Sequence, residues 1–336
     1  MKALQLQDIG KLGLAEVEIP PLRDDQILVR TGASTICTSD LNDVRENPFH
    51  ISLPQTLGHE GAGTVAAVGA AVRGFKVGDR VATHPVHPCG HCAACLGGVP
   101  HLCLELEHFG INMPGTMAEY YVARADRARV VPPSTDFSLL ALAEPVCVCL
   151  EALAQARLAA GGELLILGDG PFGLLIARLA PSLKLKHVVI AGRHNFRLGF
   201  AGEAVKVNTA GDPHPVQTLR AAVGGQGYDA AILAVDRAQA LIDGLACLKP
   251  RGRLVVFASV HGATPIDLFE LQMKELEIIG SVNDANLFDA AVHLLVDGQP
   301  PLADLVTHRF RLDDYAAAFS LAASGKEQAI KVAFEF

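Results

Sequence analysis

The glycine-rich sequence GDGPFG at residues 168–173 is the feature that most constrains how this chain can fold. It follows the apolar run LLIL at 164–167, which has the composition of a strand buried on both faces. It precedes the helical pattern FGLLIARLA and a second strand candidate, HVVIAG, at 187–192. A strand, a glycine turn, a helix and another strand in this order predict a βαβ unit and therefore a parallel sheet.

The rest of the chain predicts two domains. After the βαβ unit, the strand candidates DAAILAV and GRLVVFA flank a helical pattern, AQALIDGLACL, so residues 148–282 are expected to form a doubly wound parallel sheet. Residues 1–147 contain short strand candidates separated by Gly and Pro (QILVRTGAS, GAGTVAAVG, DRVATHPV and AEYYVA), which is typical of a β-rich, barrel-like domain. Residues 283–336 (the helical patterns LFDAAVHLLVDG and DDYAAAFSLAASG, then the strand IKVAFEF) are expected to return to that domain. The predicted fold class is α/β.

Composition excludes several kinds of protein. The net charge of −8 argues against a general nucleic-acid or acidic-lipid binder. The most apolar region, 139–160, contains Glu144, Pro145 and Glu151, so we expect no membrane span. The first 20 residues alternate like a strand and lack the apolar core of a signal peptide. A cytoplasmic protein is therefore predicted.

Four of the eight cysteines form one cluster, within a segment of about 87–105. The sequence C-GH-C-AA-C-LGGVPHL-C places them at Cys89, Cys92, Cys95 and Cys103. Two-residue gaps allow successive thiolates to converge on one ion, as in closed tetrahedral Zn²⁺ sites. Two disulfides or a group of buried thiols are the alternatives, and an iron–sulfur cluster has signatures that end differently. The spacing predicts structural zinc.

The glycine turn predicts a binding site for a dinucleotide. Its glycines permit a tight turn and the close approach of a pyrophosphate to the N-terminus of the next helix. The residues expected to contact it are Gly168, Gly170, Pro171, Phe172 and Gly173. A methyltransferase with a similar loop is the main alternative.

The end of the second strand bears on the choice of dinucleotide. An acidic residue there usually binds the ribose hydroxyls of NAD. This chain has Gly192 and Arg193 instead, and a guanidinium suits a 2′-phosphate. NADP(H) is therefore favoured over NAD(H), with a solvated surface arginine as the alternative interpretation.

Other potential metal ligands lie in separate segments. Cys37 is in TICTSDLN, His59 and Glu60 are in TLGHEGAG, and Glu144 is in LALAEPVC. Cys, His and carboxylate are all zinc ligands, and three protein ligands leave one position open for a substrate. Spacing alone does not distinguish this site from buried core residues and a surface charge.

The combination of motifs resembles the medium-chain dehydrogenase/reductase family, in its zinc-containing alcohol and polyol branch, which includes sorbitol and threonine dehydrogenases. The similarity spans essentially the whole chain. The matching segments are GHEGAGTV at 58–65, KVGDRV at 76–81, the four-cysteine segment, GTMAEYYV at 115–122, AEP at 143–145 and GDGPFG at 168–173. The resemblance implies a GroES-like catalytic domain and a Rossmann cofactor domain.

The resemblance also implies roles for individual residues. Cys37, His59 and Glu60 would hold a catalytic zinc, and Glu144 would be a nearby carboxylate that ligates it directly or through water. Asp40 would orient a ligand, and Ser39 would relay a proton.

Two positions depart from the family pattern. Asn42 replaces a histidine that passes the proton to solvent in many members, so water, His50 or His84 would have to substitute. Thr38 stands where polyol-branch members often have glycine. Neither change removes a metal ligand, but both leave the rate and the substrate open.

The implied function is the interconversion of a secondary alcohol, of the polyol or sugar-derived type, and its ketone. The expected partners are a small-molecule substrate and further copies of the chain in a homodimer or homotetramer, with the apolar strand candidate at 276–280 as one possible edge. The alternatives are a metal-independent quinone or enoyl reductase and a non-catalytic NADPH-binding protein.

Overall fold

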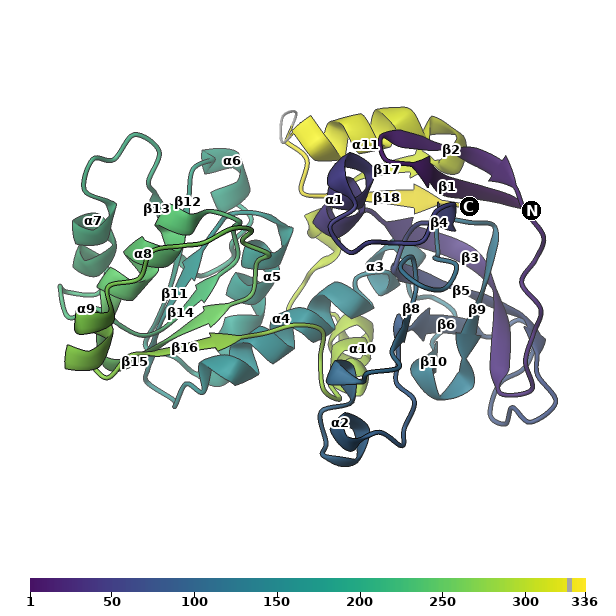
Figure 1. The fold of residues 1–336 in the computed structure, drawn as a ribbon, viewed down its shortest axis with the longest axis horizontal. Helices are drawn as coiled ribbons and strands as arrows, with labels where there is room; N and C mark the ends of the chain where they lie inside the picture. The colour runs from purple at the N-terminus through teal and green to yellow at the C-terminus, as the bar shows by residue number, and fades with distance from the viewer. Residues whose placement is uncertain (325–327) are drawn as a thin grey trace. The chain divides into compact units, whose positions relative to one another are not determined.

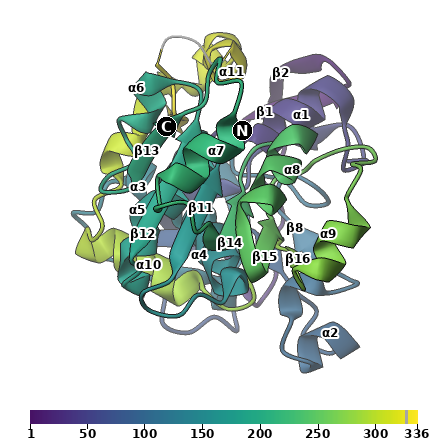
Figure 2. The same cartoon turned by 90° about the vertical axis from the view of Figure 1, so that its left-hand side faces the viewer.

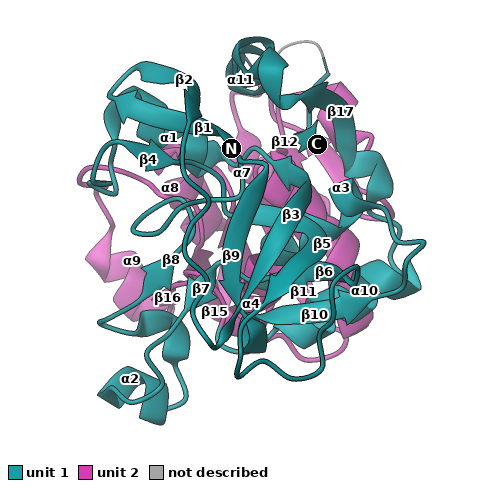
Figure 3. Cartoon of the chain, turned by 90° about the vertical axis from the view of Figure 1, so that its right-hand side faces the viewer, with its two compact units in different colours: residues 1–147, 285–336 teal, residues 148–284 magenta. Residues whose placement is uncertain are grey.

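The computed structural model describes residues 1–324 and 328–336, and the chain divides into two compact units. The first unit combines Met1–Cys147 with Ala285–Phe336, and the second is Val148–Asp284 (Figure 3). Helix α4 (Ala143–Ala156) crosses the boundary between them. The predicted C-terminal helical pattern extended to Gly325, which lies outside the described residues.

The main sheet of the first unit has seven strands. Its order is β10-β6-β5-β3-β18-β17, and β9 pairs with β3 as well (Figure 1). The strands are β3 (Gln26–Thr35), β5 (Glu60–Val68), β6 (Arg80–Thr83), β9 (Tyr120–Arg124), β10 (Ala128–Val131), β17 (Val306–Arg311) and β18 (Lys331–Glu335). The long strands β3 and β5 are antiparallel neighbours, with Thr35 opposite Glu60. The C-terminal strand β18 therefore lies inside a sheet made mostly by the N-terminal segment.

Smaller elements complete the first unit. A second sheet has the order β2-β1-β4, and β7 pairs with β8. The strands are β1 (Lys2–Asp8), β2 (Lys11–Glu16), β4 (Gln55–Thr56), β7 (Val86–His87) and β8 (Glu107–His108). The α-helices are α1 (Thr38–Glu46), α2 (Ala93–Leu96), α3 (Phe137–Leu140), α10 (Phe288–Asp297) and α11 (Tyr315–Ser324). Short 3₁₀ turns are η1 (Pro100–Leu102), η2 (Ala125–Arg127), η4 (Ala303–Leu305) and η5 (Leu312–Asp314).

The second unit is built on a six-stranded parallel sheet with the order β13-β12-β11-β14-β15-β16 (Figure 2). Its strands are β11 (Glu163–Leu167), β12 (His187–Gly192), β13 (Val205–Asn208), β14 (Tyr228–Leu233), β15 (Leu248–Val256) and β16 (Glu277–Gly280). Its helices are α5 (Pro171–Leu179), η3 (Ala180–Leu183), α6 (Asn195–Leu198), α7 (Pro215–Ala221), α8 (Ala238–Cys247) and α9 (Leu268–Met273).

Alternation along the central strands explains how the helices cover both faces of this sheet. Leu165 and Leu167 of β11 belong to an apolar cluster with Leu219 of α7 and Leu241 of α8. The side chains at the alternate positions of β11 point to the other face of the sheet, which α5 covers (Figure 1). Both faces of β11 are buried, so its near-continuous apolar run predicted a strand of this type correctly.

The predicted fold class is confirmed as α/β, with one mixed β-rich unit and one doubly wound unit. Strands β13 and β17 have no counterpart among the strands predicted from the sequence. Both strands are short and partly exposed, with lysine in β13 and two arginines in β17, so they lack a continuous apolar signal.

We expected no membrane span in the apolar region around residue 144, because it contains charged residues. This region nevertheless meets a length and composition criterion for crossing a membrane. Among the described residues, one helical stretch, Phe137–Ala156, is apolar enough, but 78% of its most apolar window is buried inside the protein. Such burial is typical of a core helix.

Candidate functional site

Strand pairing brings together three of the predicted metal ligands. Cys37 follows β3 at the start of α1, and His59 directly precedes β5. Because Thr35 and Glu60 are paired across these strands, the residues that follow β3 and precede β5 meet at one edge of the sheet. Ligand atoms of Cys37, His59 and Glu60 lie within 4.8 Å of one another. All three side chains are largely buried, and this donor set fits zinc.

Two residues of α1 orient the groups of this cluster. Asp40 accepts a hydrogen bond from the backbone N–H of Cys37 at 2.8 Å through Oδ2, and its Oδ1 lies 3.6 Å from Nδ1 of His59. Ser39 Oγ lies 3.4 Å from the other ring nitrogen, Nε2. Burial opposes the charge of His59, but Asp40 and then Cys37 outweigh burial and raise its pKa. The imidazole is thus held between a carboxylate and a hydroxyl.

Glu60 differs from the other two ligand candidates because its carboxylate already has strong partners. The ammonium of Lys331 donates to both carboxylate oxygens, and Thr35 Oγ1 donates to Oε2. Lys331 is buried, which disfavours its charge, but the carboxylates of Glu60 and Glu144 and the thiol of Cys37 outweigh burial and raise the pKa of Lys331. No sequence motif pointed to Lys331.

The remaining predicted residues of this site lie around the cluster. Glu144 is buried in the first turn of α4, close enough to Lys331 to influence it, but it is outside the group formed by Cys37, His59 and Glu60. Asn42 accepts a hydrogen bond from Arg45 at 3.2 Å. His84 is fully buried and accepts hydrogen bonds at Nδ1 from Val86 and Arg127, so it lacks the solvent contact that a proton outlet requires.

Sequence reasoning also missed a buried histidine beside His59. The ring of His108 lies 5.7 Å from that of His59, and its Nδ1 is 2.7 Å from the carbonyl oxygen of Phe109. Burial, reinforced by the charge of His59, lowers the pKa of His108 to about 3. His108 is therefore a neutral neighbour of the cluster.

The four clustered cysteines have the geometry expected of a zinc site. The Sγ–Sγ distances are 3.9 Å for Cys89–Cys95, 3.5 Å for Cys92–Cys95 and 3.7 Å for Cys92–Cys103. A tetrahedral ion with Zn–S bonds of about 2.3 Å requires separations of about 3.8 Å. Backbone N–H groups of Cys89, Gly90, Cys92 and Glu105 donate to these sulfurs, which favours thiolates. All eight cysteines of the chain are free of disulfides.

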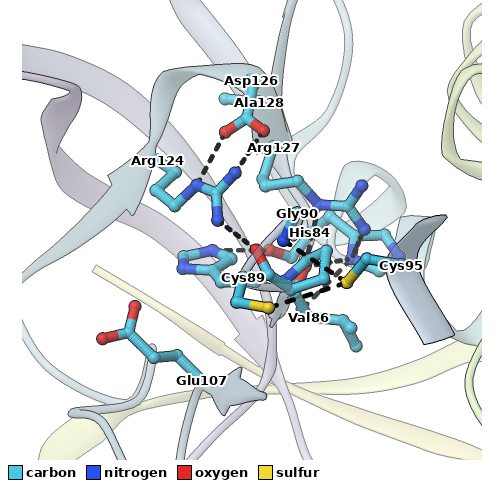
Figure 4. Close-up of polar contacts among 12 residues, drawn as sticks. His84, Val86, Cys89, Gly90, Cys95, Glu107, Arg124, Asp126, Arg127 and Ala128 are labelled. Carbon is cyan, nitrogen blue, oxygen red and sulfur yellow. Dashed lines mark hydrogen bonds and ion pairs between the residues drawn. The ribbon is translucent and has the colours of Figure 1, made fainter. Parts of the chain in front are cut away.

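Two arginines fix the segment that leads into this cluster. Arg124 Nη1 donates to the carbonyl of Pro88 at 2.6 Å, and Arg127 donates to the carbonyl of Val86 at 2.8 Å and to His84 at 2.9 Å (Figure 4). These bonds hold the backbone just before Cys89, so the first cysteine of the cluster is kept in a fixed position.

The glycine turn lies at the carboxyl ends of β11 and β12. Gly168 follows β11, Gly170 precedes α5, and Pro171 occupies its first turn. A Cβ on Gly173 would lie 2.0 Å from the carbonyl oxygen of Gly168, so only glycine allows α5 to approach the turn this closely. Phe172 packs against Phe257 at 5.3 Å between ring centroids. The N-terminus of α5, where Gly170 and Pro171 are partly exposed, suits a phosphate.

The structure adds Asp169 to the predicted residues of this site. Its buried carboxylate accepts hydrogen bonds from the backbone N–H groups of Arg193 and His194, directly after β12. A side chain on Gly192 would collide with Asp169, since an ideal Cβ would lie 2.4 Å from its Cβ. The turn and the end of β12 are therefore joined by one carboxylate, while the Arg193 side chain is exposed.

Comparison with known proteins decides the family. Residues 23–133 match the alcohol dehydrogenase GroES-like domain, and residues 171–297 match the zinc-binding dehydrogenase domain. The 2-dehydro-3-deoxy-L-galactonate 5-dehydrogenase of Pseudoalteromonas atlantica is 34% identical over 272 residues, which cover 80% of each chain. The chain belongs to the zinc-binding dehydrogenases. The resemblance stated from the motifs is confirmed, and the chain is an enzyme of the zinc-dependent alcohol and polyol dehydrogenase type.

Two solved structures have the same fold over the whole chain. A protein from Sinorhizobium meliloti 1021, solved with NADP bound, is 27% identical with a TM-score of 0.93, covering 100% of this chain and 99% of that one. An alcohol dehydrogenase from E. coli CFT073, solved with NADH, is 28% identical with a TM-score of 0.92 and the same coverage. Both of these similar structures were solved with a nicotinamide cofactor bound.

Proposed function

We propose that this dehydrogenase interconverts a secondary alcohol of a polyol or sugar-derived compound and the corresponding ketone, with NADP(H) as the cofactor. The observation that carries the proposal is the convergence of Cys37, His59 and Glu60 at the β3–β5 edge. Support for the substrate class comes from the name of the relative that acts on a sugar acid. The first unit would be the catalytic domain, and the second unit the cofactor domain.

In this proposal Cys37 and His59 hold a catalytic zinc, with a carboxylate from Glu60 or Glu144 nearby. When bound, zinc supplies a Lewis acid that makes the substrate hydroxyl easier to ionise. Ser39 lies next to Nε2 of His59, so its hydroxyl can take the proton of the alcohol and pass it to water. Asp40 keeps the His59 ring in place. A nicotinamide cofactor bound at the glycine turn would supply the hydride acceptor, and the four cysteines would hold a second, structural zinc.

The NADP(H) preference rests on the end of β12. Gly192 supplies no carboxylate there, and the exposed Arg193 guanidinium is free to meet a 2′-phosphate. The contacts to the pyrophosphate would come from the turn residues Gly168, Gly170, Pro171, Phe172 and Gly173. The NADP-bound structure supports this preference, whereas the other similar structure was solved with NADH.

The assembly proposal is a homodimer or homotetramer. In the sheet order of the described residues, β16 is the last strand, so one of its edges offers unpaired backbone groups. The preceding helix α9 exposes Leu268, Phe269 and Met273. Cytoplasmic location is supported by the free state of all eight cysteines.

Metal analysis tests the function most directly. We expect close to two zinc ions per chain in protein purified without chelator, and close to one in either Cys37→Ala or Cys95→Ala. Cys37→Ala should abolish turnover on a panel of polyols and ketones while NADPH binding, measured by calorimetry, is retained. Two zinc ions in Cys37→Ala, or undiminished turnover, would refute the assignment of the catalytic site.

A further inference from the structure

A cavity of about 560 Å³ lies in the second unit, at the amino ends of strands of the parallel sheet. It is lined by residues 156–162, which lead into β11, and by Asp229 of β14 and residues of β15. The glycine turn follows the opposite, carboxyl end of β11. The cavity is therefore separate from the proposed cofactor site.

The lining of this cavity is strongly cationic. It contains four basic side chains, Arg157, Lys249, Arg251 and Arg253, against a single carboxylate, Asp229. The ammonium of Lys249 donates to both oxygens of Asp229, at 3.0 and 2.9 Å. That ion pair leaves three guanidinium groups on the wall of the cavity.

The carboxylates that accompany two of these arginines do not line the cavity. Arg253 Nε donates to Glu277 at 2.9 Å, and Arg251 Nε lies 3.4 Å from Glu275. Both glutamates are exposed. Because water screens exposed ion pairs, such pairs contribute little free energy. Both guanidinium groups can therefore also bind an anion in the cavity.

The backbone of two of the arginines is strained. Arg157 has φ 47° and Arg251 has φ 63°, in the left-handed region that favours glycine. In β15, residues 249–252 form a bulge opposite Asp229, since the strand pairing with β14 is interrupted there. Strain and bulges of this kind are found preferentially at functional sites. Here both strained arginines line one cavity.

We propose that this cavity binds the phosphate group of a small metabolite through the guanidinium groups of Arg157, Arg251 and Arg253. A guanidinium matches phosphate with two parallel hydrogen bonds. The volume lies within the range of about 300–1,000 Å³ typical of small-molecule sites, which is more than a lone phosphate ion needs. A sugar phosphate is of suitable size. The inference does not depend on the proposed function, because it involves neither the metal cluster nor the glycine turn.

Isothermal titration calorimetry of the full chain tests the proposal. The titrants are glucose 6-phosphate, inorganic phosphate and glucose, at low ionic strength, with NADPH present to occupy the proposed cofactor site. We expect glucose 6-phosphate to bind and glucose not to bind. Weaker binding of inorganic phosphate would assign a phosphate ester as the ligand, and equal binding would assign the free ion. Absence of binding by both phosphates would overturn the proposal.

Variants at the strained positions identify the site. Arg157→Gly and Arg251→Gly should each weaken phosphate binding by about tenfold or more, because hydrogen bonds between charged groups are lost. Thermal unfolding without phosphate should show that both variants remain folded, since glycine suits a positive φ.

Lys184→Gly is the matched control. Lys184 is an exposed cation of the same unit with φ 53°, and it does not line the cavity. We expect this variant to bind phosphate as the wild type does. Undiminished binding in both arginine variants would refute the site, and so would an equal loss in Lys184→Gly, which would indicate attraction by overall charge alone.

Discussion

The carboxylate of Asp169 lies 2.8 Å from the backbone nitrogen of Arg193 and 2.7 Å from that of His194, with both N–H groups donating to Oδ2. It fills the space above Gly192 that a side chain at the end of β12 would otherwise occupy. One acidic residue of the glycine turn therefore determines where the turn after β12 lies. Cofactor binding should depend on this link.

Replacement of Asp169 by alanine should destabilise the second unit and weaken cofactor binding. Loss of two hydrogen bonds to a buried carboxylate is expected to lower the free energy of unfolding by about 2 kcal/mol. Gly192→Ala should weaken NADPH binding in the same way, because its methyl group displaces Asp169. Calorimetric titration with NADPH, together with denaturant unfolding, measures both effects. Wild-type affinity in folded Gly192→Ala would show that the link is unimportant for the cofactor.

Arg193→Ala should change the choice of cofactor. We expect kcat/KM with NADP to fall by about tenfold or more and kcat/KM with NAD to stay close to the wild-type value, since only NADP carries the 2′-phosphate. Arg73→Ala, an exposed arginine of the first unit, serves as the control. An equal loss with both cofactors would mean that Arg193 does not select between them.

Asp40→Asn should loosen the metal at the Cys37–His59 cluster. The amide oxygen can still accept a hydrogen bond from the backbone of Cys37, but the carboxylate charge beside Nδ1 of His59 is lost. Residues that orient metal-bound histidines typically contribute 10–100-fold to metal affinity. Zinc release to a competing chelator should therefore accelerate by about tenfold or more. If Asp40→Asn released zinc at the wild-type rate, the role of Asp40 would be limited to capping the N-terminus of α1.

Asp43→Asn should stabilise the protein in a pH-dependent way. Asp43 is buried in α1, and burial, assisted by the charge of Asp40, raises its pKa to about 7 from the ordinary value of 3.8. Between these two values the folded chain binds one more proton than the unfolded chain, so the contribution of Asp43 to stability decreases as pH rises through this window. Asparagine removes the titration.

The gain from Asp43→Asn should therefore be near zero at pH 4 and largest above pH 7, on the order of 3 kcal/mol. Denaturant unfolding of both proteins at several pH values provides the measurement. A gain that is the same at every pH would mean that folding leaves the pKa of Asp43 unchanged.

The parts of the molecule that could be predicted are those encoded by neighbouring residues. The four-cysteine spacing and the strand–GDGPFG–helix order are local patterns, so they indicated a metal cluster and a nucleotide turn directly. Cys37 and His59 meet only through the pairing of β3 with β5, which spacing alone does not reveal; there the resemblance to a known family was needed.

Asp169 and Lys331 escaped prediction for physical reasons that differ. Asp169 occupies a variable position of the glycine motif, and its importance depends on the path of the chain after β12. Lys331 is a single lysine in a short terminal strand, where lysine usually contacts solvent. Its burial beside Glu60 becomes visible only when the order of β5, β3 and β18 is known.

The ion pair between Glu60 and Lys331 also affects how the enzyme is made. The two residues are 271 positions apart in the chain, so a ribosome translates Glu60 long before it reaches the codon for Lys331. During that interval the newly made β3–β5 segment carries a carboxylate without its permanent counter-ion. The centre of the first unit consequently reaches its final state late in synthesis, after the whole second unit has been translated.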